Sequence, residues 1–232
     1  MIVPRFTQDR CVILSDSGVE SLLACAMAHE QQQLSGSDSS ILLPAWWEST
    51  QEIDLMISVI DRAVVRQAGV YALDIYPEAS VYPIEGDPLF EHSLGAMQSD
   101  MLLRAAHIAL RSGIRRVVWP IRAMRPEMKV EMDTLIEQVA TSVDRALLAA
   151  RLASLDADEH SAVEVIIETP FVDLTNGQVS DLASDLAIPL ETCWWQHGQN
   201  LPSAQERFAY WSSMSLRSPA QVEPKPRPQT HA

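Results

Sequence analysis

The amino-acid sequence predicts an α/β fold in which a five-stranded parallel sheet carries helices on both faces. Short apolar runs alternate with longer segments whose apolar residues recur at helical spacing. Strands buried on both faces of a parallel sheet are apolar at consecutive positions, as the run "CVIL" at 11–14 is. Helices between successive strands provide the right-handed crossovers that parallel strands require.

The strands and helices can be placed from apolar spacing and from the residues that end them. The predicted strands lie at 11–14, 41–47, 70–75, 114–121 and 162–170. The predicted helices lie at 20–33, 50–69, 91–113, 126–154 and 175–187. Gly69 and Gly113 end two of these helices, and Pro126 begins another. We expect residues 1–215 to form one domain and the proline-rich segment 216–232 to be a disordered tail.

Composition excludes several classes of protein. A net charge of −14 argues against nucleic-acid and anionic-membrane partners, which require clustered Lys and Arg. No apolar run approaches the roughly 18 residues of a membrane span, so we expect a cytoplasmic protein. The three cysteines have no CxxC spacing, and Cys11 and Cys25 fall on apolar positions that favour burial.

The predicted topology indicates where a ligand would bind. In an open parallel sheet, ligands bind beyond the C-terminal ends of the strands. Residues in those positions lie at 15–21, 44–48, 76–90, 119–127 and 169–175. The first of these segments, a turn between a strand and a helix, is a typical position for a phosphate.

Several of these segments together resemble a known family. "LSDSGVES" resembles the S-G-G-x-D-S phosphate loop of the PP-loop, adenine nucleotide alpha hydrolase-like (HUP) proteins. "TPFVDLTNG", the following "IPLETCWW" and "RPE" resemble elements of 7-cyano-7-deazaguanine synthase. Over about residues 10–196 the chain thus looks like a divergent relative of 7-cyano-7-deazaguanine synthase.

The resemblance implies a set of site residues. Those implied for nucleotide phosphates are Ser15, Asp16, Ser17, Gly18, Val19, Glu20 and Ser21. Those implied on the substrate side are Arg125, Glu127, Asp173, Thr175 and Trp194. The resemblance also implies ATP and Mg²⁺ as cofactors and a nucleotide or deazapurine as ligand, but the family's four zinc cysteines are missing, so no zinc is expected.

Each candidate also has a purely structural interpretation. Asp16 and Glu20 would either bind Mg²⁺ or sit at a helix N-terminus, where negative charge is favourable. Arg125 and Glu127 would contact a base or begin a helix, and Asp173 or Thr175 would cap one. Trp194 would stack on a ligand, pack in the core or contact a second copy in a homodimer.

Three functional hypotheses follow from the resemblance. An active protein would be an ATP-dependent C–N ligase that releases AMP and pyrophosphate and forms an amide or nitrile on 7-carboxy-7-deazaguanine, in the queuosine pathway. Alternatively, the altered motifs belong to a non-catalytic paralogue that acts as a binding or assembly module. A third hypothesis is an enzyme whose acidic loop binds a metal and a different nucleotide.

Overall fold

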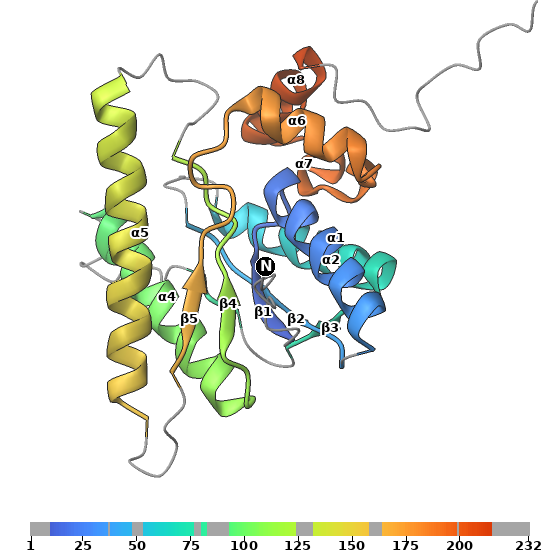
Figure 1. Ribbon diagram of the computed structural model, residues 1–232. Coiled ribbons are helices and arrows are strands. Elements are labelled where there is room, and N and C mark those ends of the chain that lie inside the picture. The colour runs from blue at the N-terminus through green and yellow to red at the C-terminus, as the bar shows by residue number, and fades with distance from the viewer. Residues whose placement is uncertain are drawn as a thin grey trace, which may run out of the picture.

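The computed structural model describes residues 10–36, 38–47, 53–76, 80–82, 93–123, 132–157, 164–198 and 200–214 (Figure 1). Its strands are β1 (Cys11–Ser15), β2 (Ile41–Pro44), β3 (Asp74–Ile75), β4 (Arg116–Val118) and β5 (Ile166–Glu168). They form one sheet in the order β3-β2-β1-β4-β5, and every neighbouring pair is parallel. The predicted five-stranded parallel α/β fold is confirmed.

Helices cover both faces of the sheet (Figure 1). One face carries α4 (Leu94–Arg111) and α5 (Met132–Leu155). The other carries α1 (Val19–Ser35) and α2 (Ile53–Tyr71). The core on that second face continues into α6 (Asn176–Asp185), the 3₁₀ turn η1 (Leu190–Thr192), α7 (Trp194–His197) and α8 (Pro202–Ser213).

Strand β1 lies at the centre of the sheet and connects the two halves of the core. Cys11 and Ile13 point into the α1–α2 half, whereas Val12 and Leu14 point into the α4–α5 half. Successive side chains of a strand alternate between its faces, so a strand covered on both faces must be apolar throughout. This arrangement explains the unbroken apolar run that predicted the strand.

The third predicted strand was placed too early in the chain. Residues 70–75 were expected to be extended after Gly69, but α2 continues to Tyr71 and β3 contains only Asp74 and Ile75. Tyr71 is buried against the core, which favours another turn of helix. Ala72 then takes the left-handed conformation, φ 50°, that usually follows a helix end and that Gly69 was expected to supply.

Helix α8 was not predicted from the sequence, although Pro202 at its first turn is a typical helix start. Its Ala204 and Trp211 are buried in the α1–α2 half of the core. Most of the irregular segment predicted at 76–90, the start of the helix predicted from 126 and the tail predicted at 216–232 lie outside the described residues.

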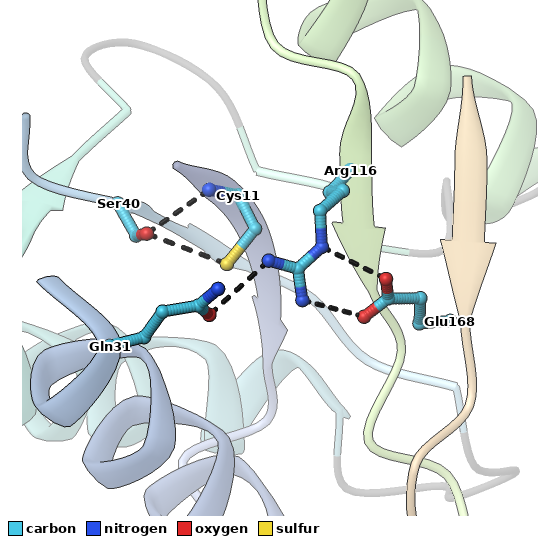
Figure 2. Close-up of polar contacts among 5 residues, drawn as sticks. All are labelled: Cys11, Gln31, Ser40, Arg116 and Glu168. Atoms are coloured by element: carbon cyan, nitrogen blue, oxygen red, sulfur yellow. Dashed lines mark hydrogen bonds and ion pairs between the residues drawn. The ribbon is translucent and has the colours of Figure 1, made fainter. Parts of the chain in front are cut away.

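A polar cluster links the edge strand β5 to the centre of the sheet (Figure 2). Arg116 donates from Nε and Nη2 to the two carboxylate oxygens of Glu168, at 2.9 and 2.8 Å. Its Nη1 donates to Gln31 Oε1 of α1 at 3.3 Å. Beside it, Ser40 Oγ accepts the backbone N–H of Cys11 at 3.1 Å. Because β4 and β5 pair over only three residues, this bidentate ion pair adds substantially to their association.

We therefore expect Arg116→Met to lower the free energy of unfolding by about 1–2 kcal/mol, since the pair is hydrogen-bonded but partly exposed. Urea unfolding measures this loss. The matched control is Arg115→Met, which removes an exposed neighbouring charge and should change stability by less than about 0.5 kcal/mol. Equal effects of the two substitutions would contradict a stabilising role for the Arg116–Glu168 pair.

Candidate functional site

The candidate site lies at the C-terminal edge of the sheet, around the junction of β1 and β4. The strand order reverses direction there, and such a switch point is where open α/β sheets bind ligands. Three segments meet at this edge: the β1–α1 loop (residues 15–21), Arg122 after β4, and the turn that leads from β5 into α6.

The β1–α1 loop is held in shape by buried hydrogen bonds. Ser15 Oγ accepts the N–H of Ser17 at 3.1 Å and donates to Gln67 Oε1 at 3.3 Å. Gln67 Nε2 donates in turn to the Ser17 carbonyl at 3.1 Å. Ser17 has φ 57°, the left-handed conformation that glycine adopts most easily, and Gly18 then becomes the N-cap of α1.

The carboxylate of Asp16 lies against the N-terminus of α1. Its Oδ1 accepts the backbone N–H of Gly18 at 2.8 Å and the hydroxyl of Ser21 at 2.6 Å. A Cβ atom at Gly18 would lie only 3.0 Å from this oxygen, so the carboxylate packs closely on the glycine. Asp16 therefore uses the kind of backbone and hydroxyl donors that bind phosphate at a helix N-terminus.

Glu20, in the first turn of α1, forms a buried ion pair with Arg122. Arg122 Nε lies 2.5 Å from Glu20 Oε1, and the two side chains are only 4% and 15% exposed. The geometry of this contact is not that of a hydrogen bond, and among the described residues the Nε–H has no other hydrogen-bond partner. Glu20 therefore stabilises Arg122 through the attraction of opposite charges.

Arg122 also contacts Asn176 and Trp211. Its Nη1 donates to Asn176 Oδ1 at the start of α6. Its guanidinium carbon lies 5.3 Å from the centre of the Trp211 ring on α8, a cation–π distance. Arg122 was not predicted as a site residue, although it directly follows the strand predicted at 114–121. Gln67 was also not predicted. It lies seven residues after Ile60 and four after Ala63, so helical spacing places this polar residue on the buried face of α2.

Several carboxylates lie close to one another at the loop. The buried Cys193 thiol lies close to the loop, and its pKa is raised well above the usual value, first by burial and then by the negative charges of Asp16, Glu20 and Glu191. An anionic ligand entering this region would be repelled by these carboxylates unless a cation accompanied it.

Of the substrate-side candidates, the structure describes Asp173, Thr175 and Trp194, and their side chains have roles away from the loop. Thr175 is the N-cap of α6, where it forms a capping box with Gln178, and Asp173 is exposed in the preceding turn. Trp194 is 2% exposed and packs edge-on against Trp46 and Trp195, at centroid distances of 6.0 and 5.9 Å. Its backbone N–H, not its ring, contacts the loop, at the Ser17 carbonyl. Arg125 and Glu127 lie outside the described residues.

A cleft of about 430 Å³ opens beside Arg122, between α4 and α5. Its polar lining residues include Gln98, Arg122, Glu137, Gln138 and Ser142. Gln98 is fixed by donation from Nε2 to the Trp47 carbonyl at 3.1 Å. The cleft therefore offers several hydrogen-bonding groups at the edge of the sheet where ligands are expected.

Within the described ranges, no three His, Cys, Asp or Glu side chains are grouped so as to bind a metal ion. Asp16 and Glu20 each use one carboxylate oxygen in their present contacts, with Gly18 and Ser21 and with Arg122 respectively. The helices that the structure describes include none with the length and apolar character needed to cross a membrane.

The sequence matches no protein-family model and none of the curated proteins. Among solved structures, one similar chain is the U34-tRNA thiolase NcsA from Methanococcus maripaludis, in a structure with its 4Fe-4S cluster. The two chains are 13% identical, with a TM-score of 0.46 over 90% of this chain and 72% of the thiolase.

We expect Glu20→Gln to destabilise the protein by about 3–5 kcal/mol, because it leaves the buried Arg122 guanidinium without a counter-charge. Urea unfolding measures the loss. Glu30→Gln is the control, since it changes an exposed glutamate of the same helix. Combining Glu20→Gln with Arg122→Met should recover part of the lost stability, because both charges are then absent. A Glu20→Gln variant as stable as Glu30→Gln would contradict the importance of this ion pair.

Proposed function

We propose that this protein is a binding or assembly module built on a PP-loop-like frame, and that its phosphate loop is closed by its own Asp16. The observation that supports this most directly is the Asp16 carboxylate, which already accepts the Gly18 N–H and the Ser21 hydroxyl. A nucleotide phosphate needs these same donors, so it would have to displace the Asp16 carboxylate from them.

The charges around the loop support the same proposal. A carboxylate held about 4 Å from a phosphate costs roughly 4 kcal/mol at an effective dielectric of 20. Glu20 cannot turn away freely, because doing so would leave Arg122 buried and unpaired. In this proposal the ligand binds in the cleft beside Arg122, where Gln98, Gln138 and Ser142 offer neutral donors and acceptors. A small polar molecule, for example a deazapurine, is the chemical class that this lining favours.

The conformation of Ser17 favours a second candidate, an ATP-dependent ligase similar to 7-cyano-7-deazaguanine synthase. Its left-handed backbone gives the loop the sharp turn that a phosphate cradle requires, despite the loss of a glycine there. In this alternative, Asp16 would help to hold Mg²⁺, whose charge would offset the repulsion between the carboxylate and the phosphates. ATP would then adenylate the carboxylate of 7-carboxy-7-deazaguanine with release of pyrophosphate, and attack by ammonia would give the amide and release AMP.

We expect calorimetry to show no ATP binding by the native protein, with or without Mg²⁺, and binding by Asp16→Ser, which frees the Gly18 N–H and the Ser21 hydroxyl. Asp16→Asn is the matched variant: it removes the charge, but its amide oxygen can still accept both hydrogen bonds. Binding by the Ser variant alone would mean that the side chain excludes ATP by occupying the donors. Binding by both variants would mean that its charge does so.

Two outcomes would contradict the closed loop. Magnesium-dependent ATP binding by the native protein, with a Kd in the micromolar to millimolar range usual for enzyme substrates, would favour the ligase. The next assay would then be pyrophosphate release with 7-carboxy-7-deazaguanine and ammonia. The second is that neither Asp16→Ser nor Asp16→Ser/Glu20→Asp binds ATP, although circular dichroism shows that both variants are folded. The loop would then not be a phosphate site.

A further inference from the structure

Helix α5 lies at the outer edge of the molecule (Figure 1). Several of its large apolar side chains are exposed to solvent. Its buried side consists of small residues, Ala146, Ala149, Ala150 and Ala153. On the opposite side, four leucines remain 48–71% exposed: Leu147, Leu148, Leu152 and Leu155. Single exposed leucines are ordinary, but four within nine residues of one helix form a continuous apolar patch of the kind that marks an interaction surface.

Two opposite charges on this side of α5 have no ion-pair partner among the described residues. Asp144 and Arg151 are exposed on the same side of α5, and neither forms an ion pair with any residue that the structure describes. They are seven residues apart, about 10.5 Å along the helix axis, too far to pair with each other. Their neighbours at helical spacing carry no charge: Ala140, Thr141, Leu147, Leu148, Ser154 and Leu155.

The order of these residues is self-complementary. If a second α5 crosses in the antiparallel direction between Leu147 and Leu148, Asp144 of each copy faces Arg151 of the other. The same register places Leu147 opposite Leu148, and Leu155 opposite Ala140. We propose that this face of α5 is the contact surface of a two-fold symmetric homodimer, with Leu147 and Leu148 at its centre and two Asp144–Arg151 ion pairs beside them.

The shape of the surface also suits a second copy. A groove of about 450 Å³ runs between α4 and α5, and Leu103, Leu148 and Leu152 line it. A leucine side chain from an opposing helix fits a groove of this kind, as in ridges-into-grooves packing. With 24 residues, α5 is about 36 Å long, so one helix pair buries less than the roughly 800 Å² per partner of a standard interface. The dimer is therefore weak and reversible.

The contact would also affect the cleft beside Arg122. Thr141 lines both the α4–α5 groove and the cleft, and Glu137 of the same helix lines the cleft. The first half of α5 thus forms a wall of the proposed binding cleft, while its second half would meet the other copy. A dimer formed in this way presents two clefts on one assembly.

Sedimentation velocity of the full chain over a wide concentration range tests this surface. We expect a reversible monomer–dimer equilibrium. Asp144→Arg and Arg151→Asp each place like charges opposite one another and should weaken the dimer at least about tenfold. The double variant Asp144→Arg/Arg151→Asp restores opposite charges and should restore the affinity. Asp181→Arg on α6 and Arg66→Asp on α2 make the same changes at exposed positions elsewhere and should leave the dimer unchanged.

Three results would overturn the proposal. One is a native chain that stays monomeric at every concentration. Another is a dimer that the two single charge reversals weaken no more than the control substitutions do. The third is a dimer that appears only after deletion of residues 215–232, because the C-terminal segment of the chain itself would then be what covers the face.

Discussion

The Arg122 guanidinium is the contact on which the C-terminal edge of the sheet depends. It joins α1 through Glu20, α6 through Asn176 and α8 through the Trp211 ring. Removing a cation and a carboxylate from water costs several kcal/mol each, and one contact rarely offsets that cost. Here a carboxylate, an amide oxygen and an aromatic face share one guanidinium. Because these partners come from distant parts of the chain, the site and the helices around it have to form together.

A second arginine, Arg116, stabilises the sheet from within β4, six residues before Arg122. Arg116 begins β4, and its bidentate pair with Glu168 spans the short β4–β5 ladder. Strands of two or three residues provide few backbone hydrogen bonds, so side chains must supply part of the association. β4 therefore contributes to the fold both through its buried Val117 and Val118 and through the side chain of Arg116.

The sequence predicts most of the sheet because most of its strands are local apolar patterns, and alternation with helices then fixes the parallel arrangement. The exception is β3, which contains the exposed Asp74 and was placed too early. The sequence predicts the site less completely. Ser15, Asp16 and Glu20 could be named because they follow a strand directly. Arg122 also follows a predicted strand, but its pairing with Glu20, like the contact of Gln67 with the loop, exists only in the folded chain and could not be predicted. Helix α8 was missed for a related reason: its sequence is polar, and it is held by a buried Trp211 that packs against residues far away in the chain.

The Asp16 carboxylate at the N-cap residue of α1 limits what such a loop can bind. The first N–H groups of a helix favour an anion, and an enzyme that uses ATP leaves them for the substrate. In this protein Asp16 lies only two residues before Gly18, whose N–H its carboxylate accepts. The effective concentration of the carboxylate at that N–H therefore far exceeds the concentration of a dissolved nucleotide. A phosphate can win this competition only with contacts that the carboxylate lacks, such as a shared metal ion. The short tether, more than the charge alone, therefore favours a closed loop.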